Sequence, residues 1–450
     1  MNWRVAAALL MMWGSSAVAQ ERVSDTVHNL SASGPGRIRA QSESQVCIFC
    51  HAPHNTQGVR PLWNRELPAS SYNIYQSSTL NAQPGQPTGS SKLCLSCHDG
   101  TIALGSVLSQ PEQIRMTGGD FLPAGLTNLG TDLSDDHPIS FYYTSGIAAS
   151  DRQLVSPSAL PRETKLDASG QLQCTSCHDP HHNRFGDFLV MRGEFGTLCN
   201  ACHAMSGWSA CAHRTSSAVV SAVQGADWPF NTVGENACRS CHRPHTAAGH
   251  ERLLIFNNDE ENCLICHDGQ VARTNIRAEI DKLSAHDPRD YSAQHDPAET
   301  RPEAQPHVEC ADCHNSHQSN AIPSTGAPLV SGATAGVKGI DASGQAIRYS
   351  QNQYEICFKC HADTNFISSL SITRQIAQLN TRLEFNPANP SFHPVMAQGV
   401  NPNVPSLLPP YTTSSKIFCT DCHNNNDPVG PKGLHGSTNN HLLAKNYSTA

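Results

Sequence analysis

The stretch Cys94-Leu-Ser-Cys-His-Asp-Gly (residues 94–100) contains the motif Cys-x-x-Cys-His, and this motif decides how the chain folds. The motif occurs nine times, and its first cysteines are Cys47, Cys94, Cys174, Cys199, Cys238, Cys263, Cys310, Cys357 and Cys419. Nine motifs of two cysteines use all but one of the 19 cysteines. The pattern is typical of covalent haem c attachment, in which two thiols bind the porphyrin and the adjacent His binds the iron.

We therefore expect nine covalently attached haem c groups. The expected covalent attachment residues are Cys47, Cys50, Cys94, Cys97, Cys174, Cys177, Cys199, Cys202, Cys238, Cys241, Cys263, Cys266, Cys310, Cys313, Cys357, Cys360, Cys419 and Cys422. The expected proximal iron ligands are His51, His98, His178, His203, His242, His267, His314, His361 and His423. Structural zinc is the competing interpretation of paired cysteines, but zinc does not require a His after every second Cys. Cys211 is left over, and we expect a buried, unreactive thiol there.

The start of the chain predicts export. Residues 1–4 are basic, residues 5–15 are apolar, and Ala17-Val18-Ala19 is a small-residue cleavage site, so residues 1–19 read as a signal peptide. The apolar run is too short to span a bilayer, and no later stretch reaches that length. We expect an exported protein, periplasmic or at the outer cell surface, without a membrane span.

Composition predicts an unusual interior. Only 38% of the residues are hydrophobic, and 31 Gly with 29 Pro interrupt regular structure. We expect mostly coil with short α-helices and little β structure, wrapped around a chain of stacked haems that supplies most of the buried surface. The formal charge of −8 argues against a nucleic-acid partner.

The motif spacing shows an internal repeat. Motifs 1 and 2, numbered in chain order, are 47 residues apart (94 − 47), as are motifs 7 and 8 (357 − 310), whereas motifs 3 and 4 (199 − 174) and motifs 5 and 6 (263 − 238) are 25 apart. This predicts four pairs of haems and a ninth. We expect a four-haem module over residues 20–213, a linker over 214–235 and a five-haem module over 236–450.

The first motif of each pair is followed three residues later by another His: His54, His181, His245 and His317. Three residues of backbone reach at most about 11 Å, which is too little to pass around a porphyrin to the other face of the same iron. Each of these histidines should therefore bind a different haem, and we expect His181 to bind the haem of motif 4, which is the nearest in sequence.

Enough other histidines exist to give every iron a second ligand. The candidates for distal ligands are His28, His54, His137, His181, His213, His245, His286, His317, His393 and His435. His295 competes with His286, because both lie in His-Asp-Pro. Ten candidates for nine irons leave one over, and a terminal one, His28 or His435, that bound a neighbouring molecule would join copies head to tail into a filament.

The sequence resembles the doubled-CxxCH multihaem c-type cytochromes. The resemblance rests on Val46-Cys-Ile-Phe-Cys-His-Ala-Pro-His54, Pro61-Leu-Trp-Asn-Arg65, His137-Pro-Ile and Cys174-Thr-Ser-Cys-His-Asp-Pro-His181. The N-terminal half is similar to the tetrahaem outer-surface cytochromes of metal-reducing bacteria, some of which form filaments. The resemblance implies that His28, His54, His137 and His181 are distal ligands.

These observations predict an electron carrier of respiratory or extracellular electron transfer, with a chain of bis-His haems and no catalytic residues. Its partners would be other redox proteins or an extracellular electron acceptor. The alternative is a multihaem reductase of a nitrogen or sulfur oxyanion, which needs one iron with an open position. Since all nine motifs end in His and distal candidates are plentiful, we expect every iron to be closed.

Overall fold

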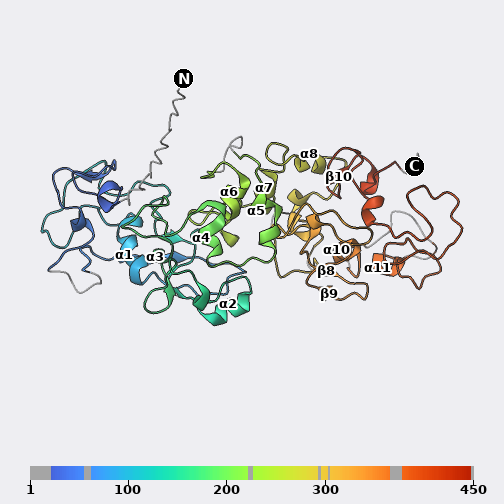
Figure 1. Ribbon diagram of the computed structural model, residues 1–450, viewed down its shortest axis with the longest axis horizontal. Helices are drawn as coiled ribbons and strands as arrows, with labels where there is room; N and C mark the ends of the chain where they lie inside the picture. The colour runs from blue at the N-terminus through green and yellow to red at the C-terminus, as the bar shows by residue number, and fades with distance from the viewer. Residues whose placement is uncertain are drawn as a thin grey trace, which may run out of the picture.

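The computed structural model describes residues 22–54, 62–220, 227–291, 295–302, 305–364, 375 and 378–446. The expected signal peptide lies outside these residues. The molecule is elongated, and the chain proceeds from one end to the other, with N-terminal segments at the left and C-terminal segments at the right of Figure 1. Among the described residues, no helix has the length and apolar character needed to span a bilayer.

Regular structure is sparse, as composition predicted. The α-helices are α1 (Gly89–His98), α2 (Ser145–Asp151), α3 (Cys174–Cys177), α4 (Thr197–Asn200), α5 (Ala212–Thr215), α6 (Val233–Asn236), α7 (Asp259–Leu264), α8 (Ile276–Ile280), α9 (Cys310–Cys313), α10 (Gln353–His361) and α11 (Thr381–Glu384). Short 3-10 helices include η2 (Cys47–Phe49), η6 (Ala237–Ser240) and η10 (Cys419–Asp421). The expectation of short helices in a mostly irregular chain is confirmed.

Among the residues that the structure describes, every strand has two residues and lies in a two-stranded sheet, beside a number of isolated β-bridges. β1 (Arg39–Ala40) pairs with β3 (Met116–Thr117), β5 (Phe141–Tyr142) with β6 (Gln171–Leu172), β7 (Ser284–Ala285) with β10 (Gly436–Ser437), and β8 (Gly339–Ile340) with β9 (Ala346–Ile347), all antiparallel, while β2 (Asn73–Ile74) and β4 (Asp132–Leu133) are parallel. Such short ladders cannot hold a fold together alone. They fix where the connecting loops meet.

Apolar side chains form several small clusters instead of one core. One cluster contains Phe49, Leu104 and Ile114, and another contains Ile340, Tyr354 and Phe358. Because the clusters are separate, side-chain packing supplies only local cohesion.

The two expected modules touch each other. The backbone N–H of His137 donates to the Pro244 carbonyl at 2.8 Å, and that of Ala247 donates to the Asp135 carbonyl at 3.0 Å. Residues on either side of the predicted 214–235 linker therefore share an interface.

Arg65 is a buried charge that connects the segments around motifs 1 and 2. Its side chain is 1% exposed, and it donates to the carbonyls of Leu104 at 2.7 Å, Ser96 at 3.0 Å and Ala103 at 2.9 Å. The guanidinium thus satisfies three carbonyls at the end of α1 and in the loop that follows it.

Replacing Arg65 by Met should lower the free energy of unfolding by at least about 2 kcal/mol, because buried carbonyls lose charged hydrogen-bond donors. Guanidinium denaturation of the haem-loaded protein followed by circular dichroism measures this. The matched control is Arg162→Met, whose side chain is 93% exposed and which should change stability by less than about 0.5 kcal/mol. Equal losses in both variants would contradict the role of Arg65.

Candidate functional site

Each of the nine motifs lies in or beside a turn of helix. At seven motifs the backbone N–H of the His donates to the carbonyl of the first Cys at 2.8 to 3.0 Å, and at motifs 2 and 8 the same residues end α1 and α10. Residues i, i+3 and i+4 of such a turn share one face. Both thiols and the imidazole therefore point to the same side, as attachment to one porphyrin requires.

The motif histidines are oriented by their Nδ1 atoms. Backbone carbonyls lie 2.7 to 2.9 Å from Nδ1 of five of them, namely His98, His178, His242, His314 and His423. Because a carbonyl can only accept, Nδ1 must carry the hydrogen and donate it. The lone pair is then on Nε2, the atom that would bind a metal.

Eight of the nine motif histidines face a second imidazole. The ring centroids of each pair are 6.0 to 6.3 Å apart. In motif order the pairs are His51 with His181, His98 with His28, His178 with His245, His203 with His137, His242 with His317, His267 with His213, His314 with His435, and His361 with His286.

This separation fits a shared iron. Two imidazoles bound through nitrogen to opposite faces of one metal have centroids about 6 Å apart, since each metal–nitrogen bond adds about 2 Å and each ring about 1 Å. Direct ring stacking would bring the centroids closer, as between His307 and Tyr291 at 4.2 Å. The residues present therefore fit haem c with two axial histidines.

The space between the pairs also fits large apolar groups. One continuous cavity of about 3090 Å³ is lined by residues from motif 1 to motif 7. Ordinary protein interiors leave voids no larger than a few waters of about 30 Å³ each.

Burial lowers the pKa of eleven of the sixteen paired histidines, and it lowers the pKa of His203 and His317 to about 4. These eleven imidazoles are therefore neutral at pH 7, which is the form that binds iron.

The histidines that face a motif histidine fall into two kinds. A histidine of the first kind follows one motif in the sequence and faces the histidine of the motif two places earlier. His181 follows motif 3 and faces His51 of motif 1, and His245 and His317 repeat this relation for motifs 3 and 5. His435 follows motif 9 and faces His314 of motif 7.

Local packing fixes the position of His435. A Cβ on the adjacent Gly436 would lie 1.8 Å from the Glu279 carbonyl oxygen, so only Gly allows this close approach.

A histidine of the second kind precedes one motif in the sequence and faces the histidine of the motif that comes next after that one. His28 precedes motif 1 and faces motif 2, His137 precedes motif 3 and faces motif 4, and His213 and His286 do the same for motifs 6 and 8. The two kinds alternate along the molecule. Motifs 1, 3, 5 and 7 face a histidine from later in the chain, and motifs 2, 4, 6 and 8 face a histidine from earlier in the chain.

Members of the two kinds lie side by side. Nδ1 of His28 lies 3.1 Å from the carbonyl of Pro180, next to His181, and Nδ1 of His213 lies 3.1 Å from the carbonyl of Ser316, next to His317. The pairing of β7 with β10 places the neighbouring residues His286 and His435 beside each other in the same way. The motifs are thus bracketed as 1 and 2, 3 and 4, 5 and 6, and 7 and 8, which is the grouping predicted from spacing.

The cysteines place the attachment sites in chain order. First cysteines of neighbouring motifs interact at four junctions, where one thiol of each pair raises the pKa of the other: Cys94 with Cys174, Cys199 with Cys238, Cys263 with Cys310, and Cys357 with Cys419. At the other four junctions second cysteines are neighbours. Burial raises the pKa of Cys50, Cys177, Cys241 and Cys360, and the thiols of Cys97, Cys202, Cys266 and Cys313, respectively, raise it further.

The two free ends of this line are exposed. Cys47 of motif 1 and Cys422 of motif 9 are the exposed members of the 19 cysteines, all of which lie in described residues. The extra cysteine, Cys211, is fully buried as expected, and its Sγ donates to the Ser316 carbonyl at 3.2 Å.

Several histidines lie elsewhere than expected. His181 faces the histidine of another motif, but this is His51 of motif 1 and not His203 of motif 4. The segment that follows motif 3 lies beside the N-terminal segment, since the Pro180 carbonyl lies 3.1 Å from Nδ1 of His28. Between the two His-Asp-Pro sequences, His286 faces a motif histidine, whereas His295 is bonded to Glu309 at 2.5 Å.

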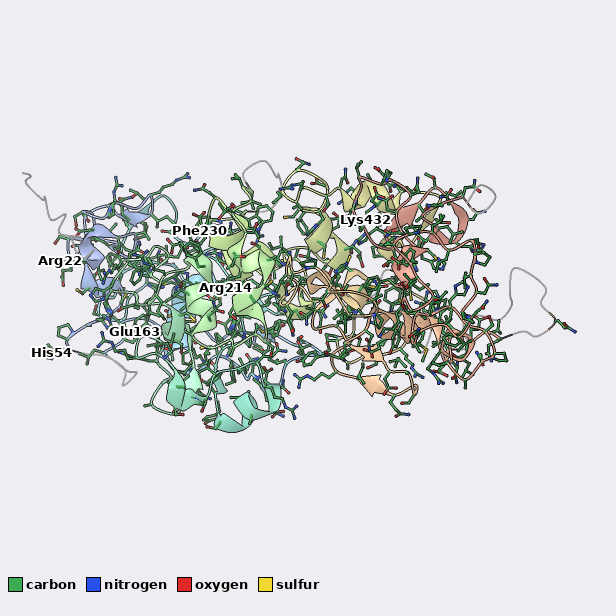
Figure 2. All side chains as sticks on the ribbon, turned by 45° about the vertical axis from the view of Figure 1, so that its right-hand side comes forward. Arg22, His54, Glu163, Arg214, Phe230 and Lys432 are labelled. Carbon is green, nitrogen blue, oxygen red and sulfur yellow. The ribbon has the colours of Figure 1, made fainter. Side chains whose placement is uncertain are left out.

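Two candidates face no motif histidine. His54 is exposed at the outer margin of the N-terminal end (Figure 2). The ring of His393 contacts Phe385 instead, with centroids 6.3 Å apart. His28 and His435, considered as bridges to a second molecule, both face histidines of their own chain.

Asp136 was not predicted from the sequence. Its carboxylate, 3% exposed, accepts from Nδ1 of His245 at 2.9 Å. A carboxylate behind an axial imidazole holds its orientation and makes Nε2 a stronger donor to a metal. The residue precedes His137, so a carboxylate next to a candidate ligand was the available signal.

Comparison with known proteins agrees with this geometry. Residues 231–272 match the family model described as "Doubled CXXCH motif". The chain is also 24% identical over 206 residues to the multiheme cytochrome MtrA of Shewanella baltica (strain OS185), which covers 43% of each chain. The chain therefore matches less than half the length of this relative.

We predict that His181 ligates the haem of motif 1. His181→Ala should create one high-spin haem, detected by electron paramagnetic resonance (EPR), because one iron loses an axial imidazole. In a variant that lacks the motif 1 haem through Cys47→Ala, Cys50→Ala and His51→Ala, the same substitution should have no effect.

His182→Ala is the control, because His182 neighbours His181 but bonds to Asp179 at 2.9 Å. A new high-spin signal from His181→Ala in the background without the motif 1 haem would show that His181 serves another motif.

Proposed function

Since this chain is a multihaem c-type cytochrome, we propose that it carries nine covalent haems in one line and conducts electrons along it. The observation that carries this proposal is the series of eight opposed imidazole pairs, whose attachment sites follow one another in chain order. At each interior site one cysteine interacts with a cysteine of the preceding site and the other with a cysteine of the next site. Such contacts keep successive redox groups close, as electron tunnelling requires.

The protein's residues would hold these groups in one redox-active state. When bound, a haem with two histidine ligands supplies a one-electron iron couple with both axial positions closed. The cysteines fix each porphyrin covalently, while backbone carbonyls and Asp136 hold the imidazoles in the orientation that presents Nε2. Burial keeps imidazoles such as His203 and His317 neutral, which is the form that binds iron.

We propose that the protein works outside the cytoplasmic membrane and exchanges electrons with other redox proteins or an extracellular acceptor. Support comes from the predicted signal peptide in residues 1–19 and from the multiheme cytochrome that the chain resembles. The exposed cysteines Cys47 and Cys422 mark the two ends at which such exchange would occur.

We favour a discrete carrier over a head-to-tail filament. The filament hypothesis relied on a terminal histidine, His28 or His435, reaching a second molecule. Both histidines have intramolecular positions opposite His98 and His314. Size-exclusion chromatography with light scattering should therefore give a monomer, and electron microscopy that reveals fibres of the native protein would contradict this.

The proposal is tested on the matured protein by intact mass and EPR. We expect a mass corresponding to nine haems and eight low-spin signals. The signals should divide into two families, because the imidazole planes are near-parallel in some pairs, such as 7° between His242 and His317, and near-perpendicular in others, such as 89° between His213 and His267. Fewer covalent haems than motifs, or mostly high-spin iron, would refute the proposed conductor.

A further inference from the structure

We infer that motif 9 holds a haem whose sixth iron position is not filled by any histidine of this chain, and that this position binds small exogenous iron ligands. The inference rests on the proposed function, because it assumes that haem is attached at Cys419 and Cys422. It gives the line of attachment sites one closed end, at motif 1, and one open end, at motif 9.

The proximal side of motif 9 is complete. The backbone N–H of His423 donates to the Cys419 carbonyl at 2.9 Å, as in the other motifs. Nδ1 of His423 donates to the His441 carbonyl at 2.9 Å, and His423 also forms a β-bridge with Leu443. His423 is therefore prepared to bind iron through Nε2 in the same manner as the paired histidines.

The chain places no histidine opposite His423. All 24 histidines fall within the described residues, so the comparison is complete for this residue type. Nine belong to motifs and eight face a motif histidine, which leaves seven: His54, His182, His250, His295, His307, His393 and His441.

Six of these seven are placed elsewhere. His182, His250, His295 and His307 bond to Asp179, Ser134, Glu309 and Glu299, respectively. His441 is exposed and follows the proximal side, since its own carbonyl accepts from His423. His54 lies at the left margin of the molecule, far from Lys432, which lies in its right half (Figure 2).

His393 lies on a segment that is hydrogen-bonded next to motif 9, but its ring contact is with Phe385 and not with His423. The carbonyl of the next residue, Pro394, accepts from the Ile417 N–H at 3.0 Å, and Val395 is 3% exposed. With its neighbours anchored in this way, the His393 ring contacts Phe385 at an interplanar angle of 80°. His137, which also precedes Pro, instead faces a motif histidine at 6.3 Å.

The order of the ligands explains this difference. A distal histidine of the second kind precedes an odd-numbered motif and faces the even-numbered motif after it, so His393, which precedes motif 9, occupies the place of a ligand to a tenth motif. A distal histidine of the first kind follows the motif two places later, so motif 9 would need a histidine after an eleventh. The sequence contains neither motif. Motif 9 is therefore the one motif that no histidine of either kind faces.

The site is connected both to the line and to solvent. The thiol of Cys419, the first cysteine of motif 9, interacts with that of Cys357 in motif 8, whereas Cys422 is exposed. Residues 400–414, which lead to the motif, are all exposed. Electrons from motif 8 and small molecules from solvent can therefore reach the same iron. The ligands expected are small neutral diatomic molecules on ferrous iron and small anions such as cyanide on ferric iron.

The test is titration of the reduced, haem-loaded protein with carbon monoxide. We expect one carbon monoxide per molecule and one high-spin ferric signal in the oxidised protein. Cys419→Ala with Cys422→Ala should abolish both while eight low-spin haems remain. His286→Ala, which opens motif 8, should raise the capacity from one to two, and His393→Ala should leave it at one.

Three results would overturn the inference. Nine attached haems that bind no carbon monoxide would refute it and leave the conductor intact, whereas fewer than nine haems would refute the proposed function itself. Binding that appears only in His393→Ala would identify His393 as the ligand. Capacity that falls as the protein is concentrated would assign the position to a second copy of the chain.

Discussion

The short backbone between a motif histidine and the next histidine is the constraint on which this structure depends. His181 follows His178 by three residues, and that distance cannot bring both imidazoles to one iron. The second imidazole must serve another motif, and it faces His51, which is 130 residues earlier (181 − 51). Repeated along the chain, this relation makes every bracket of two motifs depend on the next one.

Such ligand bridges take the place of the packing that most folds use. The helices have at most ten residues and the strands two, and apolar side chains form only separate clusters. Segments of this kind gain little stability alone. In the proposed haem-loaded protein, covalent attachment and axial ligation would tie together residues that are distant in the sequence, so that binding free energy would become folding free energy. Some buried carbonyls in these loops have no partner in secondary structure and accept hydrogen bonds from side chains instead. Arg65 donates to the carbonyls of Leu104 and Ser96 in this way.

The sequence predicted the chemistry of the site better than its connections. The nine motifs and the short helices could be predicted because they depend on local sequence, and eight of the ten candidate distal histidines face a motif histidine. The partners could not be predicted, because His54 and His181 have the same spacing to their motifs, and His393 and His137 both precede Pro. Which of these faces a motif histidine depends on whether another motif lies beside it in space. The position of a neighbouring motif depends on the whole chain and not on the local sequence. Histidines beside the first and last motifs, such as His54 and His393, therefore differ from their counterparts inside the repeat.

The cysteines left free at motifs 1 and 9 are also of different kinds. Inside the line, junctions between first cysteines alternate with junctions between second cysteines, so motif 1 is left with its first cysteine, Cys47, and motif 9 with its second, Cys422. A second copy docked head to tail would bring Cys422 against Cys47, a first-to-second junction that breaks the alternation. An even number of motifs would leave two cysteines of the same kind at the ends, and a head-to-tail contact would then continue the pattern. A head-to-tail contact between motifs 9 and 1 would therefore not continue the alternation of cysteine junctions found inside the line.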